Sequence, residues 1–402
     1  MRLPPRPLLL LAALAALPAC QDAAGVGIGL IDEADVDPAT QTVEATSVEA
    51  VEDRRPAIGF ADSTAALAQT RVLAGDVVDA VFGDARAVGY LDFVRPSVPE
   101  GITAGDVRSV RLELQRTYVY GDTTAALALA LRQVDAAAGS WSPSLDYAAD
   151  TLFAVGPVLA TATVSAADDA VAFDLPASWV EANAALLLAA DFNEAFEGFA
   201  LEPTRAGGAG AVFGFQAQTP QTRLRVITAT DTLLYRAGEV FSSLQRGEPR
   251  PAPDAFVAAQ VGSGRSARLL FPLGEVGPAA LARAVFRAPI ETSVAQEGTF
   301  VRPIARTATL FGVDTATGAR TPITVLTVEG GVASAAQSLR FTQDIQAALL
   351  GTAPFDAFEV VPGALPGSTP GLFFVPASLD VLPVLRPGGA EAPRLSLTVV
   401  GS

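Results

Sequence analysis

The chain has 402 residues, half of them hydrophobic, which is enough for two folded domains with cores of ordinary size. It carries 43 acidic residues against 27 basic ones, all of the basic residues are arginine, and it has no histidine. The missing histidine and lysine exclude Ser-His-Asp and Cys-His catalysis, histidine zinc sites, Schiff bases and phosphate-loop lysines.

The negative charge limits the classes of binding partner and is compatible with a saline environment. A formal net charge of −16 disfavours nucleic acid and anionic lipid headgroups as partners, because both would be repelled. Adaptation to a saline medium and a codon preference for arginine and alanine explain the composition equally well. The sequence leaves these two explanations open.

Residues 1–19 have the features of a secretory signal peptide. Two arginines precede an unbroken apolar run at 8–17, and the small residue Ala19 stands before Cys20, the only cysteine. The run is too short to span a membrane, which takes about 20 residues. The spacing resembles a bacterial lipobox, and it predicts that the Cys20 thiol carries a diacylglycerol and acts as a lasting membrane anchor. An ordinary signal peptide with a chance cysteine is the alternative.

Residues 20–42 are small, acidic and glycine-bearing, and they predict a flexible linker between the lipidated cysteine and the folded part. Gln21 follows Cys20, where an aspartate would favour retention at the inner membrane. The protein is therefore expected at the outer membrane, lipid-anchored, on its periplasmic or extracellular face. With Cys20 lipidated no disulfide can form, so the domains must hold together by packing alone.

From residue 43 the sequence is typical of antiparallel β structure. Short apolar runs lie between 35 glycines and 29 prolines, and several segments alternate apolar and polar residues. Strands are predicted at 107–119, 125–134, 171–175 and 222–226, and helices only at 177–190 and 342–350.

A weak internal duplication indicates two related domains. The segment 196–203, with its phenylalanines and final proline, recurs at 355–362. Five further pairs keep the same order: 91–93 with 269–271, 134–135 with 313–314, Phe173 with Phe341, 211–215 with 371–375, and 223–226 with 394–398. We therefore predict an all-β chain of two tandem related β-sandwich domains, jelly-roll-like, at 43–229 and 230–402.

The start of the first domain carries a family resemblance. The segment 72–83, followed by Arg86 and Ala87, resembles the opening of an uncharacterised family of Gram-negative (Bacteroidota-type) surface lipoproteins, a domain of unknown function. The resemblance consists of the lipobox, the acidic glycine-bearing start and an Asp-x-x-Phe-Gly turn before the first long strand. It covers mostly residues 20–130.

A second resemblance covers the first domain and, more faintly, the second. The order of strands and motifs is similar to that of disaggregatase-related (DNRLRE-type) jelly-roll modules. The matching segments are 91–93, 107–114, 140–141, 173–175 and 223–226. The two resemblances imply a jelly-roll surface lipoprotein with an unknown or carbohydrate-associated role, and they supply no catalytic residues.

The aromatic residues favour binding over catalysis. Trp141 lies with Tyr147 in a loop-like stretch with serine and proline, which makes the pair a candidate platform for stacking on a sugar ring. Packing of Trp141 under the edge of a loop is the alternative. The residues assigned to the core are Trp179, Phe196, Phe199, Phe355 and Phe358.

Carboxylates carry the metal and enzyme hypotheses. Asp191, Asn193 and Glu194 would offer oxygen ligands to a structural calcium ion. A glycoside hydrolase with paired carboxylates, such as Asp191 with Glu194, is the enzymatic alternative. With 43 acidic residues such neighbours are expected by chance, so no cofactor and no catalytic residue is predicted.

These patterns predict a non-enzymatic, lipid-anchored cell-envelope protein that acts as a binding, adhesion or structural module. Its partners would be the membrane, through the lipid on Cys20, and an envelope protein or a polysaccharide, with no nucleic acid. The alternative function is a carbohydrate-binding surface lipoprotein that captures polysaccharide. Saturable glycan binding that is lost in Trp141→Ala would favour the alternative.

Overall fold

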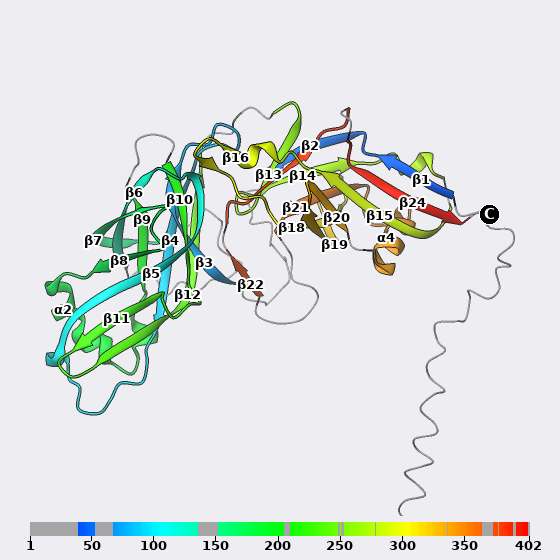
Figure 1. Cartoon of the computed structure of the whole chain (residues 1–402). Coiled ribbons are helices and arrows are strands. Elements are labelled where there is room, and N and C mark those ends of the chain that lie inside the picture. Colours follow the sequence, from blue (N-terminus) through cyan, green and yellow to red (C-terminus); the bar gives the residue numbers. More distant parts are fainter. Residues whose placement is uncertain are drawn as a thin grey trace, which may run out of the picture.

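The computed structural model describes residues 39–52, 67–135, 152–204, 210–247, 250, 253–277, 279–335, 337–363, 373–376, 378–388 and 391–400. Strands dominate these residues and form a 13-stranded and an 11-stranded sheet, both mainly antiparallel. The prediction of an all-β fold with sandwich-like sheets is confirmed. Figure 1 shows the two sheets in two lobes that lie side by side along the molecule.

The 13-stranded sheet forms the first lobe, together with the helices α2 (Ala177–Leu188) and α3 (Phe192–Ala195). Three of its short strands come from the second half of the chain. Its strands are β3 (Leu67–Val77), β4 (Ala85–Val94), β5 (Val107–Asp122), β6 (Ala126–Val134), β7 (Val155–Ser165), β8 (Ala170–Asp174), β9 (Phe199–Pro203), β10 (Gly210–Gln216), β11 (Arg223–Thr228), β12 (Thr232–Arg246), β16 (Gln296–Glu297), β17 (Phe300–Val301) and β22 (Phe373–Pro376).

The 11-stranded sheet forms the second lobe, together with the helix α4 (Leu339–Leu349) and a short 3-10 turn at Leu273–Glu275. Its first two strands come from the N-terminal part of the chain. Its strands are β1 (Ala39–Glu44), β2 (Ser47–Glu52), β13 (Phe256–Gln260), β14 (Arg265–Leu270), β15 (Ala280–Pro289), β18 (Thr307–Val313), β19 (Arg320–Glu329), β20 (Val332–Ala335), β21 (Ala357–Pro362), β23 (Val381–Leu385) and β24 (Arg394–Val400).

Alternation of side chains explains why the predicted segments form strands. In β5, Leu112 and Leu114 are fully buried whereas Arg111 is exposed. In β11, Leu224 and Val226 are likewise buried beneath a polar outer face. A period of two places all apolar side chains on one face of a sheet, and burying each one stabilises the fold by about 1.5–3 kcal/mol. The four predicted strands thus correspond to β5, β6, β8 and β11.

Helix α4 begins where Ser338 caps it. The Ser338 Oγ accepts a hydrogen bond from the Phe341 amide at 3.1 Å, and Gly351 with a φ of 66° follows the helix end. Phe341 and Ile345, four residues apart, both point into the core of the lobe. The predicted match of Phe173 with Phe341 is therefore wrong, because this cap and this spacing place Phe341 in the first turn of the helix whereas Phe173 lies in β8.

The predicted duplication is visible in the strand register. In each lobe one phenylalanine of a central strand lies opposite residues of two neighbouring strands, and these neighbours are equivalent in the two lobes. The opposed pairs are Phe199–Leu91 and Phe199–Gln133 in the first lobe, and Phe358–Leu269 and Phe358–Gly312 in the second. Strands β4, β6 and β9 therefore correspond to β14, β18 and β21. Similarly, β5 with β11 corresponds to β15 with β24, as the pairs Leu112–Leu224 and Phe286–Leu395 show.

A second predicted pair of the duplication does not hold. The segment 211–215 lies in β10, which pairs with β3 and β5, but 371–375 overlaps β22, which runs parallel to β3 of the first lobe. The position equivalent to β10 is taken by β23, which pairs with β13 and bridges from Val384 to Ile290 beside the end of β15. Similar phenylalanine-rich segments thus occupy different places, because apolar content alone does not define a strand's neighbour.

The strand that closes each lobe comes from a different part of the chain. In the first lobe, β12 pairs with β11 along its first half and with β4 along its second half. In the second lobe, β1 pairs with β24 and β2 pairs with β14, with a break at 45–46. The second lobe is therefore a circular permutation of the first.

The two sheets divide the chain differently from the predicted domains 43–229 and 230–402. Strand β12 belongs to the first lobe, and β1 and β2 belong to the second. Residues 39–42, expected in the flexible linker 20–42, form part of β1. The reason is that Val43 and Val48 bury their side chains in the core of the second lobe. Such long-range pairing leaves no local mark in the sequence.

A buried ion pair joins the lobes. Asp79 lies in the turn between β3 and β4, Arg302 lies in the segment after β17, and their side chains are 0% and 2% exposed. The Arg302 Nε and Nη2 donate to the two carboxylate oxygens at 2.8 and 3.0 Å. Tyr120 also donates to this carboxylate, and Gln260 of β13 donates to the Tyr120 hydroxyl at 3.2 Å. The two lobes are thus linked by a polar network that is shielded from water.

The electrostatics of this junction favour the ionised pair. Burial acts to raise the pKa of Asp79, but hydrogen bonds from Arg302, Tyr120 and the Val81 amide outweigh burial and leave the pKa below its usual value. An apolar cluster from both lobes surrounds the pair, including Val77 and Phe256. Removing one member of a buried pair costs about 3–5 kcal/mol, so the junction ties the folding of the two lobes together.

Candidate functional site

Three residues singled out in the sequence, Cys20, Trp141 and Tyr147, lie outside the described residues. Lipidation of Cys20 and a sugar platform at Trp141 with Tyr147 therefore stay predictions. Trp179 is described and is buried in the core of the first lobe, as expected, with 7% of its surface exposed. Its Nε1 donates a hydrogen bond to Oε1 of Gln133 at 2.8 Å.

The calcium candidate lies at the one-turn helix α3. Asp191, Asn193 and Glu194 are all exposed, and Asn193 Oδ1 already accepts a hydrogen bond from the backbone amide of Arg95 at 2.9 Å. Over the described ranges, no group of three or more Asp, Glu, His or Cys side chains is arranged to hold a metal ion. A structural calcium ion at this place stays a prediction.

A cleft in the second lobe is a stronger candidate for a ligand site. It lies between the C-terminal end of α4 and the turn at 273–275, and its volume of about 630 Å³ falls within the roughly 300–1,000 Å³ of ligand pockets. It is called the phenylalanine cleft below. Its lining residues are Phe271, Pro272, Leu273, Gly274, Asp314, Ala348, Gly351, Ala353, Pro354, Phe355, Asp356 and Phe358.

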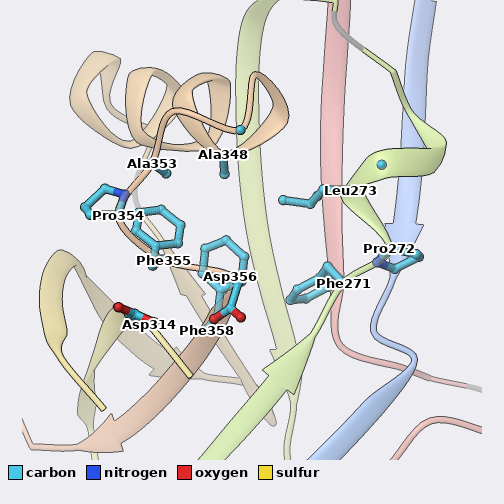
Figure 2. Close-up of a pocket in the computed structure, with 12 residues that line it drawn as sticks. Phe271, Pro272, Leu273, Asp314, Ala348, Ala353, Pro354, Phe355, Asp356 and Phe358 are labelled. Carbon is cyan, nitrogen blue, oxygen red and sulfur yellow. The ribbon is translucent and has the colours of Figure 1, made fainter. Parts of the chain in front are cut away.

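Three phenylalanine rings form one wall of the cleft. Figure 2 shows them in a row below α4. The ring centroids of Phe271 and Phe358 are 5.6 Å apart, and those of Phe355 and Phe358 are 5.5 Å apart, both in edge-to-face contact. Phe358 is 2% exposed, but Phe271 and Phe355 are only half-buried and leave ring surface open to solvent. Exposed aromatic faces of this kind bind apolar groups and the C–H faces of sugars.

Two carboxylates lie beside the rings. The Asp356 oxygens accept hydrogen bonds from the amide and hydroxyl of Thr315, at 2.8 and 2.5 Å. Asp314 likewise accepts hydrogen bonds from Thr317 and the Ala316 amide, and these bonds lower the pKa of both aspartates below the usual value. Both groups are therefore ionised at neutral pH. They can accept hydrogen bonds from a ligand's hydroxyls, whereas a glycosidase acid needs a raised pKa.

In the first lobe the ring of Trp179 packs on the corresponding phenylalanines, Phe196 and Phe199. The Trp179 ring lies 6.5 Å from Phe196 and 5.7 Å from Phe199, centroid to centroid. In the second lobe α4 contains no tryptophan. Gly312 stands at the position of Gln133, the hydrogen-bond partner of Trp179. A Cβ on Gly312 would lie 2.4 Å from the Phe355 ring, so this ring rests directly on the glycine backbone.

The sequence predicts Phe355 in the core, but in the structure its ring packs against the core of the second lobe and stays partly exposed. The duplication suggested that Phe196 and Phe355 have the same environment, and their positions in the fold are indeed equivalent. Phe196 is 2% exposed whereas Phe355 is half-buried. One signal was available in the sequence: the second half of the chain has no tryptophan to cover the repeated phenylalanines.

Comparisons with known proteins assign the chain to no family. No protein-family model matches the chain, and no curated protein matches it either. Within the described part of the chain, the helices are all too short or too polar to cross a membrane. The function of the chain is therefore inferred from its own geometry and chemistry.

Proposed function

We propose that the chain is a non-enzymatic, lipid-anchored protein of the outer membrane that acts as a binding, adhesion or structural module. The lipobox-like segment ending at Cys20 supports the anchor. The buried Asp79–Arg302 pair supports a structural role, since it keeps two lobes in one arrangement and so presents their surfaces together. An envelope protein or a polysaccharide would be the partner.

Carbohydrate capture is the alternative role, and the phenylalanine cleft favours it. Sugar-binding sites combine an aromatic face for the C–H side of the ring with acceptors for its hydroxyls. Phe271 and Phe355 provide the aromatic face. The ionised Asp314 and Asp356 provide the hydrogen-bond acceptors. The observation that carries this alternative is that Phe271 and Phe355 stay partly exposed beside two ionised carboxylates, whereas Trp179 packs on Phe196, the counterpart of Phe355.

The anchor is tested by mass spectrometry of the N-terminal peptide after expression in a Gram-negative host. We expect a diacylated thioether on Cys20 and recovery in the outer-membrane fraction, and we expect Cys20→Ser to release the protein from that fraction. An unmodified Cys20 thiol would remove the proposed location.

The binding role is tested on a glycan array with three variants. Phe355→Ala should lose saturable binding if the cleft holds the sugar, and Trp141→Ala should lose it if the loop platform does. Leu339→Ala is the matched control, because Leu339 is 75% exposed on α4 and does not line the cleft. If no glycan binds and an envelope protein copurifies instead, the structural role is favoured.

A further inference from the structure

Three arginines gather on the outer face of the second lobe. Arg283 and Arg287 lie on β15 and Arg394 lies on β24, and all three are exposed. They line a shallow hollow of about 320 Å³ on the surface of β1, β24 and β15, strands that lie side by side at the end of the molecule away from the first lobe (Figure 1). The other lining residues are Thr40, Thr42, Val285, Ser396 and Thr398. This surface is called the arginine face.

The strand register places like charges against each other on this face. Arg287 stands directly opposite Arg394, an arrangement that destabilises an antiparallel pair. Arg283 lies four residues before Arg287 on the same side of β15, about 13 Å away at the usual rise per residue. Glu44 of β1 is opposite Arg394 on its other side. Even so, within the described residues none of the three guanidinium groups forms an ion pair with a carboxylate.

The equivalent row in the first lobe has the same composition in another order, Arg236–Arg223–Glu113 in place of Glu44–Arg394–Arg287. Because the pair Leu112–Leu224 corresponds to Phe286–Leu395, Glu113 occupies the place of Arg287 and Arg223 the place of Arg394. Arg223 Nε lies 2.7 Å from the Glu113 carboxylate. In the second lobe the acid of the row is Glu44 on the other neighbouring strand, and among the described residues it forms no ion pair with Arg394. In a chain with a net charge of −16, three guanidinium groups that form no ion pair within the described ranges favour an anion as the ligand of this face.

We propose that the arginine face binds an anionic sugar polymer through its sulfate, phosphate or carboxylate groups. Guanidinium forks match these oxyanions with two parallel hydrogen bonds each. The spacing of Arg283 and Arg287 along one strand suits charges repeated along an extended chain. This proposal rests on the proposed binding role and names an anionic sugar polymer as a ligand. The surface that it uses is separate from the phenylalanine cleft.

The hydroxyls of the face favour a sugar over a membrane surface. Ser396 and Thr398 follow Arg394 on the same side of β24, and Thr42 and Thr40 lie opposite them on β1. Their hydroxyls would pair with neutral hydroxyls of a saccharide ring. The overall negative charge of the chain repels polyanions at a distance, so the attraction must be short-range and must weaken as salt is added.

The test is titration calorimetry on the full-length chain in a non-ionic detergent, with dextran sulfate as the probe and uncharged dextran of the same size as its control. We expect dextran sulfate to bind, dextran not to bind, and the affinity to fall with added salt. Arg287→Glu should weaken binding by about tenfold or more, since it restores the neutral pairing of the first lobe. Glu44→Gln should strengthen binding.

The matched control is Arg236→Glu. Arg236 is exposed on β12, opposite Arg223 in the first lobe, so this variant changes the net charge by the same amount at the corresponding row. It should bind dextran sulfate like the unaltered chain. Equal weakening in Arg236→Glu and Arg287→Glu would overturn the proposal, because binding would then follow bulk charge.

Two further outcomes also decide the matter. Failure of dextran sulfate and polygalacturonate to bind at low salt would overturn the proposal, and so would binding to anionic phospholipid vesicles in preference to both polymers. Leu339→Ala should leave dextran sulfate binding unchanged, because Leu339 is exposed on α4 and lines neither the arginine face nor the cleft. Thermal melting of Arg287→Glu shows that the variant is folded, and Arg394→Gln offers a second, milder test.

Discussion

The two lobes share one strand plan but use it differently. In the first lobe Trp179 covers the repeated phenylalanines, and Arg223 forms an ion pair with Glu113. In the second lobe the phenylalanines line an open cleft, and Arg287 replaces the acid. The hydrogen-bonded ladder is common to both because it depends on backbone register. Single side-chain changes at equivalent positions therefore decide whether a lobe is closed or offers a surface to a ligand.

A third difference lies on the strand that pairs with each duplicated phenylalanine. Asp92 in the first lobe corresponds to Leu270 in the second, because Leu91 faces Phe199 as Leu269 faces Phe358. Burial raises the pKa of Asp92 to about 7, against a hydrogen bond from the Phe93 amide, and the nearby Glu239 and Glu197 raise it further. At this position the first lobe thus carries a carboxyl whose ionised form is disfavoured by burial, whereas the second lobe has a leucine. The core of the first lobe must offset the cost of burying the Asp92 carboxyl.

The largest expected effect is at the junction, and it tests whether the lobes are separable. Asp79→Ala leaves Arg302 buried without its carboxylate, so we expect a loss of about 3–5 kcal/mol in the free energy of unfolding. Because the pKa of Asp79 is lowered by folding, this contribution is present above about pH 4 and is lost as the pH falls through the folded-state pKa. Urea denaturation at pH 7 and at pH 3 measures both effects.

The control for the junction is Asp84→Ala. Asp84 pairs with Arg250 at 2.9 Å, but both side chains are about 40% exposed, so we expect a loss below about 1 kcal/mol. Equal losses in the two variants would contradict a special role for the junction. Two separate unfolding transitions in Asp79→Ala, in place of a single one, would show that the pair is what couples the lobes.

The second prediction compares equivalent phenylalanines. Phe196→Ala should cost about 3–5 kcal/mol, because the ring is fully packed against Trp179 and Phe199. Phe355→Ala should cost about 1–2 kcal/mol, because its ring is half-exposed and leaves a smaller cavity. Guanidinium denaturation of both variants gives the comparison. Similar costs would mean that the cleft is closed in solution.

The third prediction uses the buried acid of the first lobe. Because the pKa of Asp92 is raised in the folded protein, the folded state keeps a proton that the unfolded chain releases, so stability falls as pH rises from about 4 to about 7 and then levels. Asp92→Asn should remove this fall and stabilise the protein by about 1–3 kcal/mol at pH 8. Melting temperatures between pH 5 and pH 8 measure it, and an unchanged pH profile would contradict the raised pKa.

The smallest expected effect is at the arginine face. Arg287→Glu should raise the free energy of unfolding by about 0.2–1 kcal/mol, because Arg394 then faces an opposite charge, as Arg223 faces Glu113. The gain should shrink in high salt. Urea denaturation at two salt concentrations measures it. A loss of stability would show that the two lobes do not use equivalent rows in the same way.

The all-β fold, its main strands and the duplication could be predicted from the sequence. Alternation such as that of Leu112 and Leu114 is a local property, since one strand must present its apolar side chains to one face whatever its partner is. The repeated segment around Phe199 and Phe358 likewise keeps its spacing because both lobes pack it between the same two neighbours. Even Trp179 was recognisable as a core residue from its position at a helix start.

Only the tertiary structure decided which strands meet and which surfaces stay open. Three features depend on pairings between segments far apart in the chain. They are the closure of the second lobe by β1 and β2, the ion pair of Asp79 with Arg302, and the position of Arg287 opposite Arg394. Sequence periodicity reports which face of a strand is buried, but it carries no information on the residue across the ladder. The cleft and the arginine face arise from those partners, and so they became visible only when the sheets were assembled.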